Sequence, residues 1–301
     1  MPHQLFLPAT LTRIHTYEPG EVRKVELTLP ERFEVDGKVL PVRDRMPPGS
    51  AFLARPFGQR TGKYRRRMYT RSNCVKQAPR VLETIINDTH RDKADTSPWW
   101  QSEAIEQAVA SGGTIDVLAH VDAEGTEIQV YANSYKVAHN NLILEPDEEW
   151  PSMRILALAF STGITPFLAH LRYMREQGFG KTGRCHGVEY ILIASARNPR
   201  QLIQHDELLE LTNAFPEHVQ YHPVLTREWP DDWRYTKGRI IKAEGREGKE
   251  PAIDLSGLLA LNPHISDFHV RLCGNASARD QLTQGLNQLG LVPLSFRAET
   301  W

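Results

Sequence analysis

The sequence contains few cysteines and no long apolar run, and these absences narrow the kinds of protein that it can encode. The three cysteines, Cys74, Cys185 and Cys273, are isolated among 301 residues, so neither a disulfide framework nor a cysteine-ligated iron–sulfur centre is expected. The twelve histidines never occur at metal-ligand spacing together with a partner carboxylate on one helix face. No segment approaches the roughly 20 apolar residues of a membrane span, and the N-terminus lacks a signal-peptide pattern. We therefore expect a soluble cytoplasmic protein without a metal site.

Charge is nearly balanced over the whole chain but uneven along it. The formal net charge of −1 gives no general signal for nucleic acid. Residues 55–71, the basic segment, nevertheless contain seven lysines and arginines and no acidic residue. Such a segment faces either something negatively charged or solvent. Tyr64, Met68 and Tyr69 alternate with the arginines, which favours a strand that presents one set of side chains to a ligand.

The first half of the chain consists of short apolar segments rich in β-branched and aromatic residues. Turn residues separate these segments, which predicts an antiparallel sheet or barrel. One helix is expected at 99–113, where Ser97 can cap the N-terminus, Pro98 can open the first turn and Gly112–Gly113 can end the last one. The expected strands are 9–17, 21–29, 50–57, 80–88, 114–121 and 126–132.

The second half alternates strands and helices, which predicts a parallel sheet covered by helices on both faces. Prolines and acidic residues cluster at 140–152, as is typical of a domain boundary. We therefore expect one domain at 1–149 and a second at 150–301. The expected strands are 154–160, 190–196, 219–225 and 268–274, and the expected helices are 166–178, 201–215, 254–261 and 278–290.

A segment that can bind phosphate follows the expected strand 154–160. In a parallel sheet, ligands bind beyond the carboxyl ends of the strands. Ser161, Thr162 and Gly163 would expose backbone N–H groups at a helix start, where the helix dipole favours an anion. A Thr–Gly turn between a strand and a helix is also common for purely structural reasons, so this segment alone does not decide the function.

Four short stretches resemble, in sequence order, the motifs of the ferredoxin–NADP⁺ reductase superfamily. They are RMYT at 67–70, STGITP at 161–166, YHPVLTRE at 221–228 and LCGN at 272–275. The resemblance covers nearly the whole chain. It implies an N-terminal antiparallel flavin-binding β-barrel followed by a parallel-sheet nicotinamide-nucleotide-binding domain, with FAD and NADP(H) as cofactors.

The resemblance also assigns residues to the flavin. In the family's Arg-x-Tyr-Ser motif, the Tyr lies against the flavin ring, the hydroxyl bonds to it and the Arg meets the pyrophosphate; Tyr69, Thr70 and Arg67 stand at these positions. A planar guanidinium binds phosphate bidentately, and a flat aromatic side chain suits a flat ring. The alternative is a barrel strand with a buried Tyr69 and exposed arginines. Trp301 resembles the terminal aromatic residue that stacks on the flavin in many bacterial members, the alternative being a frayed terminus.

Further residues resemble the nucleotide-binding positions of the family. Thr162 and Gly163 correspond to the phosphate loop, and Cys273 to the cysteine that lies near the hydride-donating carbon of the nicotinamide. A small buried hydrophobic residue on a core strand is the alternative role of Cys273. Gly274 and Asn275 follow it. The candidates for binding a 2′-phosphate, and hence for a preference for NADPH over NADH, are Arg197, Thr226, Arg227, Arg234, Tyr235, Lys237 and Arg239.

The sequence departs from the family pattern at three places. Ser161 replaces the first glycine of Gly-Thr-Gly, which restricts the backbone there. The helix start that binds the flavin pyrophosphate reads DTSPWW at 95–100, where Ser97 and the N–H groups after Pro98 can take that role. A Gly-Pro-x-Gly turn near the end of the barrel is missing. FMN is therefore an alternative to FAD.

The expected function is an electron-transfer enzyme, with Tyr69, Cys273 and Trp301 as its catalytic residues. NADPH passes hydride to the flavin, which exchanges single electrons with a ferredoxin or flavodoxin. We expect a monomer that binds neither nucleic acid nor membrane. Alternatives are the reductase component of an oxygenase, a free-flavin or ferric reductase, and a regulatory subunit that has lost its chemistry. An acidic carrier would dock on the surplus cations of the basic segment, which are Arg60, Lys63, Arg65 and Arg66.

Overall fold

The computed structural model describes residues 4–19, 21–58, 61–87, 96–130, 142–144, 153–179, 183–244 and 252–300. The chain divides into two compact units. Unit 1 comprises residues 1–146 together with 168–176, and unit 2 comprises residues 147–167 and 177–301. The domain boundary expected between residues 149 and 150 falls outside the described residues, so it stays a prediction.

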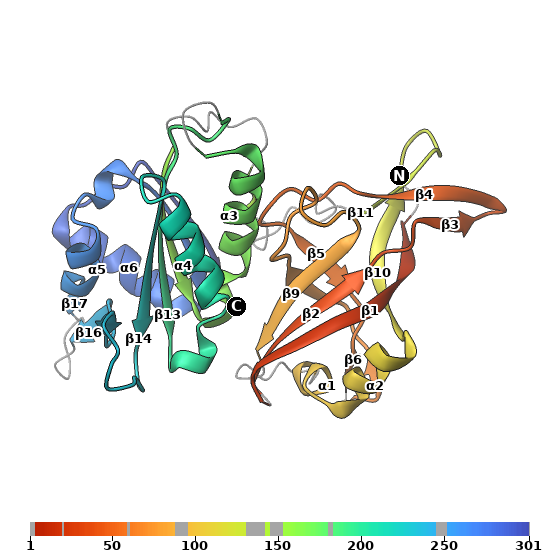
Figure 1. Cartoon of the computed structure of the whole chain (residues 1–301), viewed down its shortest axis with the longest axis horizontal. Coiled ribbons are helices and arrows are strands. Elements are labelled where there is room, and N and C mark those ends of the chain that lie inside the picture. Colours follow the sequence, from red (N-terminus) through yellow and green to blue (C-terminus); the bar gives the residue numbers. More distant parts are fainter. Residues whose placement is uncertain are drawn as a thin grey trace. The chain divides into compact units, whose positions relative to one another are not determined.

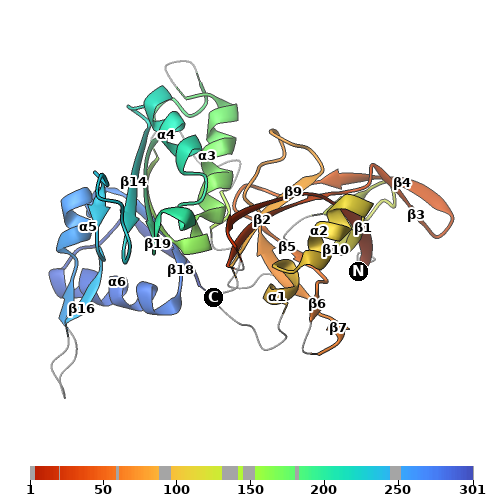
Figure 2. The same cartoon turned by 60° about the horizontal axis from the view of Figure 1, so that its bottom comes forward.

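Unit 1 is built on a curled sheet, which Figures 1 and 2 show from two directions. The strands follow the order β3-β4-β11-β10-β1-β2-β9, with β5 paired to β10 and β8 paired to β5. All of these pairs are antiparallel except β4 with β11. A separate hairpin joins β6 to β7. The strands are β1 (Gln4–Glu18), β2 (Val22–Thr28), β3 (Arg32–Val35), β4 (Lys38–Asp44), β5 (Ala51–Ala54), β6 (Phe57–Gly58), β7 (Lys63–Tyr64), β8 (Arg67–Thr70), β9 (Val81–Asn87), β10 (Thr114–Val121) and β11 (Ile128–Val130).

Six of these strands form a closed ring. The ladders run from β9 through β2, β1, β10 and β5 to β8. Two more hydrogen bonds close the gap: the N–H of Ser72 donates to the Glu83 carbonyl (2.8 Å), and the Thr84 hydroxyl donates to the Thr70 carbonyl (2.8 Å). Alternate residues of the strands point inward and form one apolar core. The expected antiparallel barrel is confirmed.

The hairpin of β3 and β4 was not predicted, although its sequence contains a strong signal. Asp36 and Gly37 both have positive φ angles, of 51° and 76°, as a type I′ turn requires. The stretch EVDGKV carries the Asp-Gly pair that favours this turn. The turn residues, rather than the weak alternation of the flanking strands, would have located the hairpin.

The single helix expected at 99–113 is interrupted. The structure has α1 (Ser97–Trp100) and α2 (Glu103–Ser111), with Ser102 in an extended conformation between them. The buried Arg23 of β2 donates to the carbonyls of Trp100 (3.1 Å) and Ser102 (3.4 Å). A side chain that takes up carbonyl groups can replace the ladder of a continuous helix. The expected end of the helix is correct, because Gly112 caps α2 in the left-handed conformation.

Unit 2 contains a six-stranded sheet in the order β15-β14-β13-β12-β18-β19. Every pair is parallel, so the parallel domain expected from the sequence is confirmed. A two-stranded antiparallel sheet, β16 with β17, lies beside it. The strands are β12 (Arg154–Phe160), β13 (Glu189–Ala196), β14 (Val219–Leu225), β15 (Thr236–Lys237), β16 (Lys242–Glu244), β17 (Ala252–Asp254), β18 (His269–Gly274) and β19 (Ser295–Thr300).

Helices cover both faces of this sheet, as Figure 1 shows. Helices α5 and α6 pack on the face formed by Leu156, Ile191 and Leu272, and α4 lies on the opposite face. The helices of the second half of the chain are α3 (Thr165–Gln177), α4 (His205–Ala214), α5 (Ser256–Leu261) and α6 (Ala276–Leu289), with short 3₁₀ segments η3 (Ser161–Ile164), η4 (Pro199–Gln201) and η5 (Ile265–Asp267). Residues 168–176 of α3 belong to unit 1. Within the described ranges, no helix combines the length and apolarity that a bilayer span requires.

Two elements of unit 2 differ from the expectation. The helix expected at 201–215 begins only at His205, because Gln204 takes a positive φ of 55° that separates η4 from α4. Strand β19 was not expected at all. It pairs in parallel with β18, and its alternation of partly exposed and buried residues is too weak a signal beside the continuous apolar strands of the same sheet.

Candidate functional site

The Arg67–Thr70 motif lies on β8, which pairs with β5 in the ring of strands. Four register pairs with β5 fix its backbone, among them Phe52 with Tyr69. The ring of Tyr69 is half-buried and lies 5.9 Å from that of Phe52. Arg67 and Thr70 are half-buried as well. The strand therefore carries an aromatic ring, a hydroxyl and a guanidinium within four residues, the chemistry that a planar ring with a pyrophosphate requires.

Arg71, the last cation of the basic segment, does not face a ligand. Its side chain is fully buried and forms an ion pair with the buried Asp44 (2.7 Å). Its guanidinium also donates to the side chain of Asn73 (2.8 Å) and to the Val81 carbonyl (2.8 Å). Burial lowers the pKa of Arg71 and raises that of Asp44, while their mutual attraction opposes both shifts. Arg71 thus faces a negative group within the protein itself, an acid distant in sequence, and neither a ligand nor solvent.

A second buried network surrounds Glu83 of β9. Its carboxylate accepts from Arg172 of α3 (2.6 Å) and from the Ser72 hydroxyl (2.6 Å), and Lys24 lies 3.2 Å away. Burial by itself raises the pKa of Glu83, but the charges of Arg172 and Lys24 outweigh it, and the pKa is lowered overall. Glu83 is therefore a carboxylate in the folded protein, and it fixes the backbone just after Thr70 through Ser72.

The rest of the basic segment is largely accessible. Lys63, Arg65 and Arg66 are exposed, and the ring of Tyr64 is 62% exposed. Arg55 is neutralised by Asp116 at 3.1 Å. Of the cations expected to bind an acidic carrier, three are therefore described and exposed, and they lie next to the exposed Tyr64 in the sequence. Arg60 was expected to join them, but it lies outside the described residues.

Two predicted flavin contacts cannot be placed on this framework. Ser97 begins the four-residue helix α1, but its side chain is not among those described. Trp301 lies outside the described residues. Both assignments stay predictions.

The predicted phosphate loop follows β12 as expected. Ser161 begins the 3₁₀ segment η3 with a φ of 53°, a left-handed conformation that glycine adopts without strain. Ser161 thus adopts a backbone conformation that is typical of glycine. Thr162 and Gly163 follow, and the Thr165 hydroxyl donates to the Thr162 carbonyl (2.5 Å). Helix α3 starts directly after them.

The Cys273–Asn275 turn lies beside this loop. Cys273 of β18 pairs in register with Ala159 of β12, one residue before that strand ends. A Cβ on Gly274 would come within 2.8 Å of the Phe160 side chain, so only glycine allows the two strand ends to pack this closely. The Asn275 side chain accepts from the N–H of Ala278 (2.8 Å) and caps α6. The order of the sheet reverses between β12 and β18, the position where parallel sheets bind nucleotides.

Glu299 is a site residue that the sequence analysis missed. It is buried and pairs in register with Cys273 across β18 and β19. Burial raises the pKa of the Cys273 thiol well above its ordinary value, and the charge of Glu299 raises it further. Cys273 is thus a neutral thiol rather than a thiolate. Sequence reasoning could not place Glu299 next to Cys273, because strand β19, which carries it, was not expected.

The predicted 2′-phosphate residues gather at the same edge of the sheet. Thr226 directly follows β14 and donates from both its N–H (2.9 Å) and its hydroxyl (3.0 Å) to the Ala196 carbonyl, at the end of β13. The Arg227 N–H donates to the Arg197 carbonyl (3.1 Å), and Lys237 of β15 pairs in register with Leu225. The exposed side chains of this cation cluster are Arg227, Arg234, Lys237 and Arg239, and Arg197 is half-buried.

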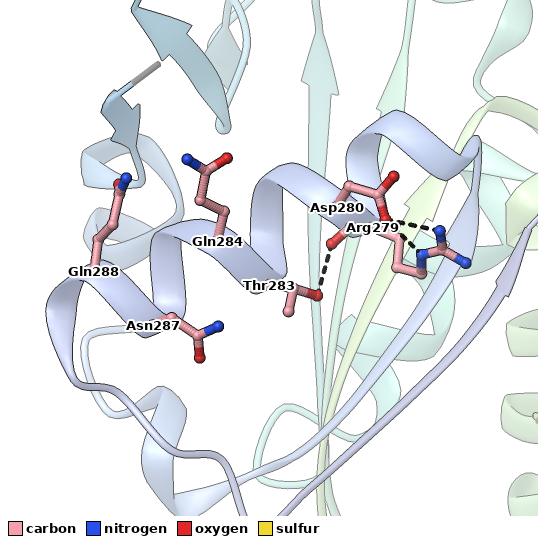
Figure 3. Close-up of a pocket in the computed structure, with 6 residues that line it drawn as sticks. All are labelled: Arg279, Asp280, Thr283, Gln284, Asn287 and Gln288. Atoms are coloured by element: carbon pink, nitrogen blue, oxygen red, sulfur yellow. Dashed lines mark hydrogen bonds and ion pairs between the residues drawn. The ribbon is translucent and has the colours of Figure 1, made fainter. Parts of the chain in front are cut away.

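A shallow hollow of about 480 Å³ lies elsewhere, on the exposed side of α6. Figure 3 shows that its side chains all come from that one helix. Arg279 is paired with Asp280 (2.7 Å), and the other lining residues are neutral. Because only one helix lines it, the hollow can enclose a ligand less well than the carboxyl edge of the sheet can. Among the described residues, no group of three or more His, Cys, Asp or Glu side chains could hold a metal ion.

Comparison with known proteins agrees with this geometry. Residues 158–279 match the family described as the oxidoreductase NAD-binding domain. This segment includes the phosphate loop, the cation cluster and the Cys273–Asn275 turn. No curated protein gives a significant match to the sequence.

Several solved structures share the fold of the whole chain. A cytochrome P450 reductase from Amycolatopsis has 16% identity and a TM-score of 0.63, covering 100% of this chain and 71% of that one. A ferredoxin NADP⁺ reductase from Neisseria gonorrhoeae with bound FAD and NADP has 16% identity and a TM-score of 0.58, covering 98% of both chains. The FAD/NAD-binding domain of nitric oxide dioxygenase from Vibrio cholerae has 14% identity and a TM-score of 0.61, covering 98% of both chains.

These findings show the fold of the protein. Residues 158–279 resemble an oxidoreductase NAD-binding domain. The chain as a whole shares the fold of the solved ferredoxin NADP⁺ reductase and of the FAD/NAD-binding domain, as the four sequence motifs implied.

Proposed function

We propose that this chain is a flavin-dependent oxidoreductase that oxidises NADPH and exchanges single electrons with an acidic protein carrier, a ferredoxin or a flavodoxin. The carboxyl edge of the unit 2 sheet carries the proposal, because the phosphate loop, the Cys273–Asn275 turn and the cation cluster all lie along it. FAD, when bound, accepts a hydride from a reduced nicotinamide and releases the electrons singly.

The residues of unit 1 suit FAD. Tyr69 offers a half-buried ring on a fixed strand, Thr70 a hydroxyl and Arg67 a cation for the pyrophosphate. We assign the ring of Tyr69 to the flavin and Arg67 to the phosphates. The neighbour from Neisseria gonorrhoeae carries FAD and NADP on the same fold, which supports the dinucleotide over FMN.

The residues of unit 2 suit the two ends of a nicotinamide dinucleotide. The backbone N–H groups at Thr162 and Gly163 lead into α3 and would bind phosphate. Cys273 would contact the nicotinamide as a neutral, polarisable group, since its raised pKa keeps the thiol protonated. Asn275, which is held as the cap of α6, would fix the turn that orients the ring.

The cation cluster supports NADPH as the reductant. Arg227, Lys237 and Arg239 are exposed at the ends of β14 and β15, beyond the strand ends where the adenosine of a nucleotide binds in such sheets. A 2′-phosphate is a dianion, and charge-assisted hydrogen bonds from several cations would distinguish it from a plain hydroxyl. The half-buried Arg197 lies on the neighbouring strand end and would complete the cluster.

The surface of the basic segment supports an acidic partner. Lys63, Arg65 and Arg66 are exposed close in sequence to the flavin motif, and opposite charges raise the rate at which two proteins meet. A second candidate function is the reductase component of an oxygenase. Neighbours of the same fold include the cytochrome P450 reductase from Amycolatopsis and a ferredoxin reductase in carbazole 1,9a-dioxygenase.

Spectroscopy of the purified protein tests the proposal. After incubation with FAD and removal of unbound flavin, the protein should be yellow, and anaerobic NADPH should bleach the flavin absorption. NADH should bleach it more slowly. A protein that stays colourless after incubation with either FAD or FMN would favour a regulatory subunit instead. Turnover with a purified ferredoxin or flavodoxin, compared with an oxygenase component, then separates the two candidate functions.

A further inference from the structure

Trp100 lies in direct contact with the predicted flavin residue Tyr69. The indole N–H of Trp100 donates to the Tyr69 hydroxyl oxygen at 2.8 Å. The two rings are nearly perpendicular, with an interplanar angle of 80° and centroids 5.6 Å apart. Trp100 is 1% exposed, so the hydrogen bond is shielded from competing water.

Trp100 is itself held firmly in place. Its carbonyl accepts from the buried Arg23 (3.1 Å), and Arg23 also pairs with Glu106 of α2 (2.9 Å). The indole packs in the core of the barrel. The interruption of the helix at Ser102 thus has a consequence for the site, because Arg23 anchors the last residue of α1 just where its side chain reaches Tyr69.

The hydrogen bond also fixes the direction of the Tyr69 hydroxyl. An indole N–H is a donor only, so the phenol oxygen must act as its acceptor, and the phenol hydrogen must point elsewhere. Phe52 packs against the same ring from β5. The hydroxyl oxygen lies on the χ2 axis, so the hydrogen bond fixes the direction of the side chain but not the rotation of its ring. The packed rings of Phe52 and Trp100 limit that rotation, so the plane of the Tyr69 ring is set before a ligand arrives.

We propose that Trp100 is a positioning residue for the flavin, which holds the ring of Tyr69 at the orientation for stacking. This inference rests on the proposed flavin-binding function. Preorganisation of this kind raises affinity, because the side chain is already ordered in the free protein and loses little conformational entropy when the ligand binds. The segment DTSPWW departs from the family pattern, and by this proposal its second tryptophan, Trp100, contributes to flavin binding by positioning Tyr69.

The test is a double-mutant cycle on the affinity of the apoprotein for FAD, measured by quenching of flavin fluorescence. Trp100→Phe keeps an aromatic ring but removes the donor, and we expect it to weaken FAD binding about fivefold, the worth of one hydrogen bond. In the Tyr69→Phe background the same change should have almost no further effect, because the acceptor is already gone. Trp233→Phe is the matched control, since it removes an indole donor in unit 2, which bonds to the Thr236 carbonyl (3.2 Å), and should leave the FAD affinity unchanged.

A purely structural role of Trp100 gives a different pattern. Trp100→Phe would then lower the thermal midpoint and weaken FAD binding equally with and without the Tyr69 hydroxyl, which would overturn the proposal. If wild-type apoprotein binds no FAD, the proposed function fails and this role fails with it. If the wild type binds FAD and Trp100→Phe binds it equally well, only the positioning role is overturned.

A second measurement covers the case in which Trp100→Phe does not fold. In protein labelled with ¹⁵N-tryptophan, the six indole N–H groups can be followed by NMR. One indole resonance should move to the position of a weaker hydrogen bond in the Tyr69→Phe variant, and in the wild type the same resonance should shift when FAD is added. If Tyr69→Phe moves no indole resonance, or if FAD leaves that resonance in place, Trp100 does not position Tyr69 for the flavin.

Discussion

The arginines of the two units differ in what neutralises them. In unit 1, Arg23, Arg71 and Arg172 are buried and form ion pairs with acidic residues of the same unit. At the carboxyl edge of unit 2, by contrast, Arg227 and Arg239 are exposed. Buried Arg271 shows that unit 2 also places an arginine inside, but away from the cation cluster.

This difference separates two uses of the same side chain. A buried cation must have a partner, because an unpaired charge in a protein interior is costly. An exposed cluster of cations repels itself slightly, and it lowers the free energy only when an anion binds. The arginines of unit 1 therefore fix the backbone around β8 and α1, while those of unit 2 are suited to a ligand. Substitutions in the two sets should have opposite profiles, with loss of stability in the first and loss of binding in the second.

The largest effect is expected for Arg71→Met. The substitution leaves the Asp44 carboxylate buried without its cation, which costs about 3–5 kcal/mol of unfolding free energy. Urea titration followed by far-UV circular dichroism measures this loss. Arg71→Met combined with Asp44→Leu should recover most of it, because no charge is then left uncompensated.

Arg65→Met is the matched control within the basic segment. Arg65 is exposed, so its replacement should change the unfolding free energy by less than about 0.5 kcal/mol. If Arg71→Met and Arg65→Met are equally stable, the distinction between internal and external arginines does not hold for this segment.

The next effect concerns cofactor choice in unit 2. Arg227→Ala should lower the efficiency with NADPH relative to NADH by roughly tenfold or more, the range of one charge-assisted hydrogen bond to a phosphate. Steady-state kcat/KM with both nucleotides gives this ratio. Arg279→Ala on α6 removes a partly exposed arginine of unit 2 that is paired with Asp280, and it should leave the ratio unchanged. An unchanged ratio in Arg227→Ala would refute the assignment of the cluster, and unfolding free energies should be the same for both variants.

A smaller, salt-dependent effect is expected for docking. Arg65→Glu with Arg66→Glu should slow the reduction of an acidic carrier about tenfold at low ionic strength, and the difference should shrink as salt shortens the Debye length towards about 8 Å. Reduction of a neutral quinone serves as the reference reaction. Arg13→Glu with Arg32→Glu makes the same change in net charge at exposed positions of β1 and β3. If both double variants slow the carrier equally, net charge and not a local docking surface is responsible.

The sequence predicted the features that follow from periodicity and chain order. Continuous apolar strands alternating with helices defined the parallel sheet of unit 2, and the parallel direction brought Thr162, Thr226 and Cys273 to one edge without any knowledge of contacts. The left-handed Ser161 could not be foreseen, because serine rarely adopts that conformation and only its surroundings impose it.

The features that the sequence did not reveal depend on partners distant along the chain. Counting charges in the basic segment cannot separate Arg71 from Arg65, since the difference lies in Asp44 on another strand. The break between α1 and α2 depends on Arg23 of β2, and the contact of Trp100 with Tyr69 depends on that break. Local patterns predict elements, but the pairing of buried polar groups is a property of the folded chain.

The smallest effect concerns how the free energy of unfolding changes with pH, and it tests whether the buried arginines of unit 1 stabilise their acidic partners. The pKa of Glu83 is lowered in the folded protein: burial opposes this shift, but the charges of Arg172 and Lys24 prevail. The unfolded chain therefore takes up the proton first, at the ordinary glutamate pKa of about 4.3, and acidification favours unfolding. The contribution of Glu83 is fully present above that value, and it is lost as the pH falls through the lower pKa of the folded state.

Urea titrations between about pH 7 and pH 3 should show a shallower acid-induced loss of stability for Glu83→Gln than for the wild type. Glu34→Gln, at an exposed position of β3, should follow the wild-type slope. If the slope of Glu83→Gln equals that of the wild type, the carboxylate is not held by its neighbours, and the network around Arg172 does not stabilise the charged form.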